Sequence, residues 1–550
     1  MESPKEAINP RNGFNSSTKT FLSLRPPLLL PPENIPLSAA AHAFSLRRTL
    51  PWPDSVALIN SATGEKLLYS DLARQTQSLA ANLRTLVGLS KGDTAFVLSP
   101  NSVRVPILYF ALLSLGVVIS PANPLSSDSE IARLIELCNP VVAFATSATA
   151  HKLLRSPIGI RTVLIIDSPE FESLMTTRSG EIDSSESGEM IVRQSDLAAI
   201  MYSSGTTGKV KGVMTTHRNL IAMVAGYHAN RAERESPAVV LYTVPYFHIY
   251  GFFYAAKSVA LGDAVVVMEG KFEVRKMLRA VEEFKVTMTA LVPPIVVAMV
   301  KSSHGYDLSS LECVGSGGSS LRKEGIMSFK AEFPNVMLIQ GYGLTESTGA
   351  AFRMLGEEES KHWGSCGRLS EGFEAKIVDP ETGHGLPPGK QGELWIRGPS
   401  IMKGYIGDEE ATSTAIVEGG WLRTGDLCYI DEEGFLYVVD RLKELIKYKA
   451  YQVAPAELEQ LLQSHPKILD AAVIPYPDEE AGQVPMAVVV RQPKSNLGES
   501  EVMDFVAKQV APFKKIRRVA FVDSIPKSAA GKILRRELKN IFIPASLSRL

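Results

Sequence analysis

A ten-residue run from Ser203 to Gly212 combines the residue types that bind phosphate through a loop. Its three glycines allow the backbone to turn tightly and to bring N–H groups close to an anion. Four hydroxyl groups and Lys211 offer further contacts to phosphate oxygens. The run follows a predicted buried strand over 197–202 and lacks the GxxxxGK[ST] spacing of the Walker loop. The sequence therefore predicts a phosphate-binding loop with the contact residues Ser203, Ser204, Gly205, Thr206, Thr207, Gly208 and Lys211.

Three further blocks of the sequence combine residues that could do chemistry. The first reads QGYGLTE over 340–346, and the second reads GWLRTGD over 420–426, followed by DRLKELIK over 440–447. The third, PKSAAGKILRR, covers 526–536 and surrounds Lys532 with small residues, which suits a loop tip that presents one lysine. Each block alone is also compatible with a turn or with a solvated basic face. Their occurrence in this order after the phosphate loop makes a shared site the better interpretation.

In this order the four blocks resemble those of the acyl-adenylate-forming (ATP-dependent AMP-binding) superfamily. That superfamily includes acyl-CoA synthetases, insect luciferases and the adenylation domains of peptide synthetases. The resemblance covers about 52–539, and the chain is most similar to plant 4-coumarate:CoA ligases and their peroxisomal relatives. It implies an α/β fold: a large N-terminal domain of two α/β subdomains plus a small β-barrel, then a small mobile α+β C-terminal domain.

The resemblance also implies an ATP site with defined roles for the residues of these blocks. Tyr342 would stack on adenine, and Glu346 would hold Mg²⁺ because a carboxylate is a hard ligand for a hard cation. Asp426 would accept hydrogen bonds from the ribose hydroxyls through its two oxygens. Thr345 would contact the α-phosphate, and Lys532 would contact both the acid's carboxylate and the α-phosphate. The implied ATP site also contains Gln340, Gly341 and Arg441, and the implied catalytic group is Lys532, Lys211, Thr345 and Glu346.

Binding of the acid and of coenzyme A is implied in the same way. The acyl-AMP residues would be His248, Tyr250, Tyr254, Ser319, Gln340, Gly341, Thr345, Lys443 and Lys447, with the hinge of the mobile domain at Lys443. The residues for coenzyme A would be Lys271, Lys449 and Ala450. His248 is compatible with a general base and equally with a packing residue. Tyr254 replaces a smaller residue of the hydroxycinnamate ligases, and Ala450 replaces a glycine, which could narrow the pantetheine channel.

The composition limits the class of protein. A chain of 550 residues is long enough for two or more domains, and its 58 basic and 59 acidic residues give a net charge of -1. This balance gives no reason to expect nucleic acid or an anionic membrane as a partner. The four cysteines form no CxxC pair, which argues against metal clusters and disulfide frameworks. An apolar stretch at 105–120 is too short to span a bilayer and is predicted to be a buried helix, so we expect a soluble protein.

Hydrophobic patterning indicates the elements that position these blocks. Short apolar strands at 94–98, 140–146 and 162–167 alternate with helical patterns, as in parallel sheets covered on both faces. A second α/β block follows residue 191, and a β-rich unit is predicted around 365–440. We expect an N-terminal arm over 1–50, an AMP-binding N-terminal domain over 51–440 and a C-terminal lid domain over 441–550.

The implied reaction is the two-step ligation of a carboxylic acid to coenzyme A. The acid and ATP would give acyl-AMP and pyrophosphate, and coenzyme A would then displace AMP; ATP, Mg²⁺, coenzyme A and the acid are thus the expected ligands. The first expected acid is a hydroxycinnamate such as 4-coumarate, and the alternative is a medium- or long-chain fatty acid or a jasmonate precursor. A non-catalytic nucleotide sensor is an alternative of another class, which the presence of Lys211, Asp426, Arg441 and Lys532 disfavours.

The last three residues, Ser548-Arg549-Leu550, are a conservative variant of the Ser-Lys-Leu peroxisomal address. They predict binding to the peroxisomal import receptor and a location in the peroxisome. The alternative location is the cytoplasm.

Overall fold

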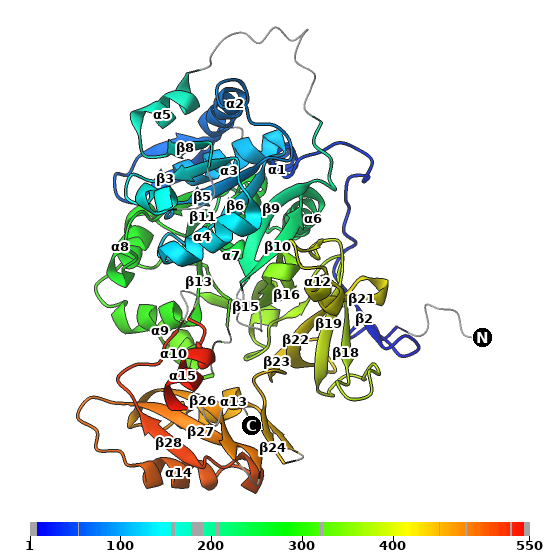
Figure 1. The fold of residues 1–550 in the computed structure, drawn as a ribbon, viewed down its shortest axis with the longest axis vertical. Helices are drawn as coiled ribbons and strands as arrows, with labels where there is room; N and C mark the ends of the chain where they lie inside the picture. The colour runs from blue at the N-terminus through cyan, green and yellow to red at the C-terminus, as the bar shows by residue number, and fades with distance from the viewer. Residues whose placement is uncertain are drawn as a thin grey trace.

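We describe a computed structural model of the protein (Figure 1). The described residues are 8–52, 54–155, 160–177, 191–203, 210–319, 321, 323–449, 451–478, 481–527 and 531–543. Four β-sheets and their helices form the molecule, and the orange-to-red strands of the last sheet lie at the bottom of Figure 1.

The first sheet has seven strands in the order β20-β10-β9-β6-β5-β7-β8. Its central and far strands are parallel, whereas β10 pairs antiparallel with both β9 and β20. The strand bounds are β5 Thr94–Leu98, β6 Val118–Pro121, β7 Val142–Ala145, β8 Thr162–Ile165, β9 Leu197–Ser203, β10 Lys211–Thr216 and β20 Gly404–Tyr405. The helices of this region are α2 Tyr69–Thr85, α3 Arg104–Leu115, α4 Asp128–Cys138, α5 Pro169–Thr176 and α6 His217–Ala229, with a 3-10 turn at Ala150–Arg155.

The second sheet has nine strands in the order β17-β16-β15-β14-β13-β11-β12-β3-β4. Strands β15, β14, β13, β11, β12 and β3 are parallel, so their carboxyl ends meet at one edge. The strand bounds are β3 Val56–Asn60, β4 Lys66–Leu68, β11 Val239–Tyr242, β12 Ala264–Val267, β13 Met288–Leu291, β14 Cys313–Ser316, β15 Met337–Leu344, β16 Gly349–Arg353 and β17 Arg368–Leu369. The associated helices are α1 Ala39–Arg47, α7 Ile249–Leu261, α8 Val274–Phe284, α9 Pro293–Ser302 and α10 Lys323–Glu332.

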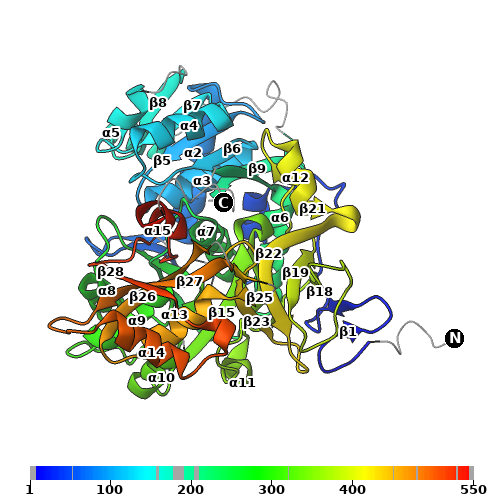
Figure 2. The ribbon, with the colours of Figure 1, turned by 60° about the horizontal axis from the view of Figure 1, so that its bottom comes forward.

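The third sheet is antiparallel, and its strands follow the open path β1-β2-β18-β19-β22-β21 with β23 paired to β22. Its bounds are β1 Phe14–Asn15, β2 Thr20–Leu22, β18 Glu374–Val378, β19 Gly392–Arg397, β21 Ile416–Val417, β22 Trp421–Ile430 and β23 Leu436–Arg441; α11 Gly356–Ser360 and α12 Glu409–Ala415 lie nearby in the chain. The expected small barrel is therefore an open sheet in its described strand pairings, because the short edge strands β1 and β21 do not pair with each other. Figure 2 shows the blue β1 region beside this sheet.

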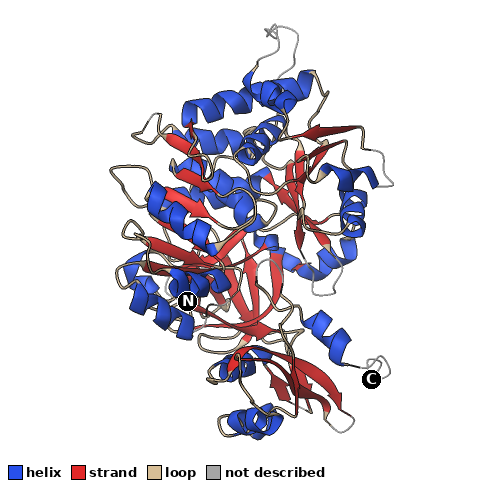
Figure 3. Ribbon diagram, turned by 90° about the vertical axis from the view of Figure 1, so that its left-hand side faces the viewer, coloured by secondary structure: helices blue, strands red, loops and turns tan. Residues whose placement is uncertain are grey.

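The fourth sheet, which Figures 2 and 3 also show, belongs to the C-terminal part of the chain and has the order β25-β24-β27-β26 with β28 beside β27. Its two faces bury alternate residues of β26, since successive side chains of a strand point to opposite sides. Ala471 and Val473 pack in one cluster with α13 and α14, and Ala472 and Ile474 pack in another with Leu538 of α15. The bounds are β24 Ile446–Tyr448, β25 Tyr451–Val453, β26 Ile468–Asp478, β27 Gly482–Arg491, β28 Arg518–Phe521, α13 Pro455–Gln463, α14 Glu499–Ala507 and α15 Arg535–Phe542.

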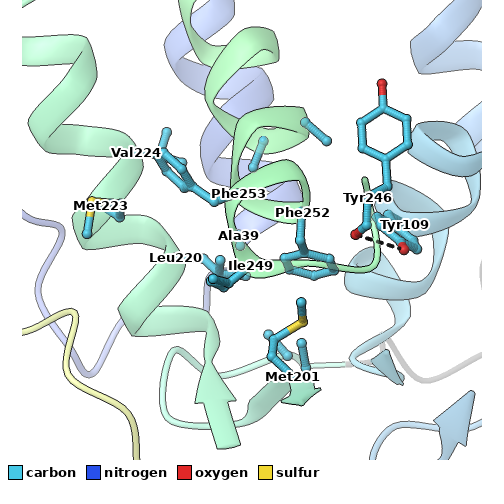
Figure 4. Packing of buried hydrophobic residues seen from close by; sticks show 14 of the residues in the cluster. Ala39, Tyr109, Met201, Leu220, Met223, Val224, Tyr246, Ile249, Phe252 and Phe253 are labelled. Atoms are coloured by element: carbon cyan, nitrogen blue, oxygen red, sulfur yellow. Dashed lines mark hydrogen bonds between the residues drawn. The ribbon is translucent and has the colours of Figure 1, made fainter. Parts of the chain in front are cut away.

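The main hydrophobic core lies between the first two sheets, where α6 and α7 contact each other and α1 packs on both. Figure 4 shows Phe252 and Phe253 of α7 among residues of α6, α1 and β9. Helix α6 begins at a capping box, in which Thr216 accepts a hydrogen bond from the backbone N–H of Asn219. This core fixes α7, the helix that carries the predicted acyl-site residues Tyr250 and Tyr254.

One predicted element differs from the structure. The apolar stretch at 105–120 is predicted as one helix, but α3 ends at Leu115 and residues 118–121 form the buried strand β6. Gly116 adopts a left-handed conformation with φ of 67° and ends the helix. Residues of the predicted N-terminal arm also contain regular structure, because β1, β2 and α1 all lie before residue 50.

Candidate active site

A cavity of about 1310 Å³ lies at the carboxyl ends of β14 and β15 and extends along the sheet. Residues from all parts of the chain line it, including Ser203 at the end of β9, Tyr250 of α7 and Thr345 after β15. The C-terminal part of the chain contributes Lys443 and Lys532. The structure thus brings the end of the phosphate-loop block, the other three blocks and the predicted acyl helix to one cavity.

The described ends of the predicted phosphate loop are both at the cavity. Ser203 and Lys211 are register partners in the antiparallel pair of β9 and β10, and both line the cavity. The residues between them that carry the predicted phosphate contacts lie outside the described residues: Ser204, Gly205, Thr206, Thr207 and Gly208. Their contacts with phosphate remain predictions.

Glu346 is the centre of a polar cluster beside these ends. The hydroxyl groups of Ser203 and Tyr405 each donate a hydrogen bond of 3.0 Å to its Oε1 atom. The Lys211 ammonium lies 4.5 Å from the centroid of the Tyr405 ring. Burial, together with the Glu346 carboxylate, raises the pKa of Tyr405 well above its usual value. The hydroxyl therefore stays protonated and acts as the hydrogen-bond donor to Glu346.

Glu346 could contribute to a magnesium site. Within the described ranges, no group of three His, Cys, Asp or Glu side chains could hold a metal ion alone. Mg²⁺ usually keeps several waters and binds one or two carboxylates together with substrate phosphates. A single carboxylate beside the phosphate-loop ends fits this pattern, in which the ion enters with the phosphates of ATP.

Tyr342 and Asp426 form a buried pair beside the cavity. The Tyr342 hydroxyl donates a 2.6 Å hydrogen bond to Oδ2 of Asp426, and Nε of Arg441 lies 3.2 Å from Oδ1. Burial raises the pKa of Asp426, and the positive charge of Arg441 opposes this effect. Three residues that the sequence predicts to bind the nucleotide, from two of the blocks, are thus linked directly.

Glu393 fixes the turn that precedes Asp426. Its carboxylate accepts hydrogen bonds from the Arg423 guanidinium at 3.1 and 3.2 Å and from the backbone N–H of Gly425 at 3.2 Å. Glu393 is buried and lines the cavity. The sequence analysis missed this residue and Tyr405, because each lies on a strand without a local motif and is placed only by strand pairing.

Close backbone packing shapes the block at 340–346. A Cβ atom on Gly343 would lie 2.1 Å from the carbonyl oxygen of Gly349, so a side chain there would clash with the paired strand. The next turn is a short 3-10 helix at Thr345–Ser347 that is closed by Thr348, whose φ is 59°. Gln340 donates through Nε2 to the carbonyl of Ser365 at 3.3 Å. This geometry holds Thr345 and Glu346 at the cavity wall.

Lys532 reaches the cavity from the C-terminal part of the chain. The preceding Gly531 packs against Pro294 at the start of α9, where an added Cβ atom would be 2.8 Å from the proline ring. Burial lowers the pKa of Lys532, as does the nearby Arg441, whereas Glu444 and Asp426 oppose the shift. Lys532 therefore sits in the electrostatic field of the predicted ribose site.

The structure assigns a clear local role to His248. It is the N-cap of α7, and its Nδ1 accepts a 3.2 Å hydrogen bond from the backbone N–H of Tyr250. This bond requires an unprotonated Nδ1, and burial lowers the pKa of His248 and so favours the neutral ring. His248, Tyr250 and Tyr254 all line the cavity, and the two tyrosine rings are 4.9 Å apart.

Two family models match the sequence. The AMP-binding enzyme model matches residues 47–406, and the AMP-binding enzyme C-terminal domain model matches residues 457–532. The first match covers more than half of the chain. This chain belongs to the AMP-binding enzyme family.

Curated relatives define the group within the family. This chain is 51% identical over 556 residues to 4-coumarate–CoA ligase-like 9 of Arabidopsis thaliana, with 99% of this chain and 98% of the relative covered. It is 47% identical over 554 residues to peroxisomal OPC-8:0-CoA ligase 1 of the same species, with coverages of 99% and 100%. The protein is therefore an acyl-CoA ligase of the 4-coumarate–CoA-ligase-like group, in a family of ATP-dependent, AMP-forming acid–CoA ligases.

Solved structures confirm the fold class. ATP-bound MatB from Rhodopseudomonas palustris has a TM-score of 0.82 at 27% identity, with 92% of this chain and 99% of that chain covered. MenE from Bacillus subtilis, in complex with ATP and magnesium ion, has a TM-score of 0.79 at 28% identity, with coverages of 90% and 99%. The α/β fold with a large N-terminal and a small C-terminal domain is as the sequence predicts.

Some predicted residues of this AMP-binding enzyme lie outside the cavity lining. Four of them are exposed and do not line the cavity in the described structure: Ser319, Lys271, Lys447 and Lys449. Ala450 lies outside the described residues. Among the helices in the described ranges, none has the length and hydropathy needed to cross a membrane.

Proposed function

We propose that the enzyme activates a carboxylic acid with ATP and Mg²⁺ as acyl-AMP and then transfers the acyl group to coenzyme A. The observation that supports this most strongly is the convergence of Lys532 with Thr345 and Glu346 at one cavity. The relatives support it as well, because MenE was solved with ATP and magnesium and with an acyl-adenylate intermediate. The family uses ATP with Mg²⁺ and coenzyme A.

In the first step, the negative charges of the carboxylate and of the α-phosphate must come together. Lys532 would neutralise part of this charge, and Arg441 and Asp426 would hold the ribose end of the nucleotide. Glu346 would orient Mg²⁺, which supplies further positive charge at the phosphates. Such preorganised charges stabilise a transition state because they do not have to be assembled during the reaction.

The second step would use another orientation of the C-terminal domain. Lys449 is exposed and away from the cavity lining, so a role in binding coenzyme A requires this domain to move. The turn at 442–444 lies between the large part of the chain and the small sheet, and Leu442 donates a backbone hydrogen bond to Gly425 there. We propose this turn, including Lys443, as the hinge between domains at 51–440 and 441–550.

For the acid, we propose a medium- or long-chain acyl group in preference to a hydroxycinnamate. The residues that line the cavity include Cys313 and Gly315 of β14 and Met337, Ile339 and Gly341 of β15. Residues 337 and 341 are separated by roughly 13 Å, at about 3.3 Å per residue. The cavity therefore follows the sheet from the carboxyl ends of its strands to their amino ends.

Hydroxycinnamates such as 4-coumarate stay a second candidate because aromatic rings line the middle of the cavity. Tyr250 and Tyr254 are on α7, and Tyr227 is on α6. Flat aromatic acids would pack against such rings.

A panel of acids tests both the reaction and the choice of acid. Acid-dependent exchange of pyrophosphate into ATP would be measured first, and acyl-CoA formation second, for cinnamates and for straight-chain acids of increasing length. We expect kcat/KM to rise with chain length beyond that of cinnamate. Higher values for 4-coumarate would favour the second candidate. Nucleotide binding without acid-dependent exchange would identify a non-catalytic sensor and would contradict the proposal.

We also propose a peroxisomal location. Support comes from Ser548-Arg549-Leu550, which lie outside the described residues, and from a relative whose name includes peroxisomal. A fluorescent fusion with a free C-terminus should enter peroxisomes, and removal of the tripeptide should leave it in the cytoplasm. Cytoplasmic signal from the intact fusion would contradict this.

A further inference from the structure

A buried ion pair lies at the far end of the cavity. Lys257, in the last turns of α7, and Asp263, just before β12, are each 5% exposed and both line the cavity. Their Nζ and Oδ2 atoms are 3.8 Å apart, which is beyond hydrogen-bond distance. Taking two charges out of water costs several kcal/mol per ion, and well-packed apolar residues often replace such a pair without loss of stability. Packing alone therefore does not explain the pair.

Both members of the pair have unused hydrogen-bonding capacity. The Lys257 ammonium can donate three hydrogen bonds, and within the described residues one goes to a protein acceptor, the Tyr242 hydroxyl at 3.3 Å. Its other neighbours are the rings of Tyr227, Tyr242 and Tyr254, with centroids 5.0 to 5.8 Å away. Oδ2 of Asp263 is buried and accepts no hydrogen bond from any described residue. The cavity end thus offers a donor and an acceptor side by side.

The pair lies at a depth that a bound acyl group could reach. Tyr250, Tyr254 and Lys257 are four and three residues apart on α7 and so share one helix face. Seven residues at about 1.5 Å each place Lys257 roughly 10 Å beyond Tyr250 along the helix axis. Gly317 lines the same cavity beside Tyr250, and an added Cβ atom there would be in van der Waals contact with the Tyr250 hydroxyl, at 3.4 Å.

The local charges favour an uncharged ligand group. Asp263 offsets the charge of Lys257, and the nearby Arg234 is paired with Glu312 through two hydrogen bonds of 2.7 Å. A second carboxylate on the ligand would meet Asp263 without an additional cation. A hydroxyl oxygen about 2.8 Å from both Nζ and Oδ2 is geometrically compatible with their separation, and it can accept from one and donate to the other.

We propose that the acid carries a hydroxyl group at its far end, which accepts a hydrogen bond from Lys257 and donates one to Asp263. This inference rests on the proposed ligase function and adds the specificity of its acyl site. The hydroxyl could belong to a hydroxylated aliphatic chain or to a phenol, and the two sources share the same chemistry.

Matched acids test the proposal on the wild-type enzyme. At the chain length that the panel of acids selects, kcat/KM would be compared for acids that end in methyl, hydroxyl, ketone and carboxylate groups. The hydroxy acid should exceed the methyl-terminated acid by at least about tenfold, since a site built to bond a hydroxyl rejects analogues that lack it. The ratio of kcat/KM for 4-coumarate to that for cinnamate would be measured in the same way. A high ratio for this pair would identify the hydroxyl as a phenol, and a high ratio for the straight-chain acids alone would identify it as an aliphatic alcohol.

Substitutions then separate recognition from a structural role. In Lys257→Met the new side chain has a similar length and no charge. The ratio of kcat/KM for the hydroxy acid to kcat/KM for the methyl-terminated acid should then be close to one. Asp263→Asn keeps an acceptor oxygen and should lower the ratio less. Lys276→Met, on the exposed side of α8, is the matched control and should leave the ratio unchanged.

Several outcomes would overturn the inference. One is a higher kcat/KM of the wild-type enzyme for the methyl-terminated, keto or dicarboxylic acid than for the hydroxy acid. Another is an equal loss of kcat/KM for the hydroxy acid and for the methyl-terminated acid in Lys257→Met. The wild-type ratio decides the matter even if a variant does not fold. Absence of acid-dependent exchange with every acid would refute the ligase function itself, whereas active enzyme without hydroxyl preference would refute the recognition by Lys257 and Asp263 alone.

Discussion

Lys532 lies at the cavity close to the predicted ribose site, although it follows Asp426 by more than a hundred residues in the sequence. It lines the cavity, and Asp426 and Arg441 both influence its charge. The sequence predicts its role from a short basic loop, and the structure adds its position next to the other blocks. A charge on a separate domain can be withdrawn after the first step, which would leave room for coenzyme A.

Removal of this charge should affect the first step specifically. Lys532→Ala should lower acid-dependent pyrophosphate exchange by roughly two to three orders of magnitude, the usual effect of losing one preorganised group. Because burial lowers the pKa of Lys532, exchange should also fall at a lower alkaline pH than an ordinary lysine would give. Both effects are measured by exchange rates across a pH series.

Lys527 offers the matched control. It is on the same loop but forms a salt bridge with Asp470 of β26 within the C-terminal domain. Lys527→Ala should keep exchange within about twofold of wild type. Equal loss in both variants would indicate that the loop acts only through domain folding and not through the charge at 532.

His248 shows what the structure adds at the residue scale to a residue with two interpretations. The sequence left a general base and a packing residue open, and the structure shows an N-cap whose Nδ1 is already engaged. This cap at the start of α7 therefore depends on a neutral ring. This explains a histidine at the cavity without giving it a proton-transfer role.

At the scale of elements, α7 contributes several residues to the wall of the cavity, including Tyr250 and Tyr254 of the predicted acyl site. Its first turn packs so closely on the preceding segment that a Cβ atom on Gly251 would be 2.2 Å from the Pro245 carbonyl oxygen. Gly251→Ala should therefore shift the helix and lower the free energy of unfolding by about 1–3 kcal/mol. KM for the acid should rise, because Tyr250 moves with the helix.

Thermal unfolding and KM for acid and for ATP measure these effects. The control is Gly498→Ala before α14, where nothing lies within 4 Å of the added atom. If KM for ATP rose as much as KM for the acid, the effect of position 251 would be a general loss of structure and not a change of the acyl channel.

Local sequence patterns predicted strands better than the ends of helices. The strand at 94–98 has the predicted bounds. The stretch at 105–120 was misassigned because a fully buried helix and a buried parallel strand are both uniformly apolar, and only Gly116 separates them. The periodicity of hydrophobic residues cannot distinguish a helix from a strand where all faces of the element are buried.

At the scale of the whole molecule, buried neutral histidines link stability to pH. His217 is fully buried at the start of α6, and its Nδ1 accepts a 3.0 Å hydrogen bond from Ala39 of α1. Burial lowers its pKa to about 4, and the pKa values of His42 and His228 are also lowered to about 4, again mainly by burial. All three residues lie where helices from distant parts of the chain meet.

These histidines should make the protein less stable on acidification. Between pH 6.5 and about 4 the unfolded chain binds protons that the folded protein does not, so stability falls as pH falls. Where the unfolded chain binds one full proton more at one histidine than the folded protein does, the free energy of unfolding changes by roughly 1.4 kcal/mol per pH unit. The unfolding temperature should therefore drop steadily below pH 6.5.

His217→Asn keeps an acceptor for Ala39 and removes one titrating group, so its unfolding temperature should depend less steeply on pH between 6.5 and 4. His384→Asn, at an exposed position, should leave the slope as in wild type. An unchanged slope in His217→Asn would show that the other groups account for acid sensitivity.

The sequence alone predicted the chemistry of the nucleotide site, because a loop that binds phosphate and blocks that bind ribose must carry particular residues at short spacing. It also predicted the fold class, through the resemblance of these blocks to a known superfamily, with which the alternation of apolar strands and helices agrees. Tertiary structure alone decided that Tyr405 and Glu393 contact these blocks, and that Lys257 and Asp263 meet at the cavity. Those contacts join residues on different strands and turns, and only the packing of sheets and helices brings them together.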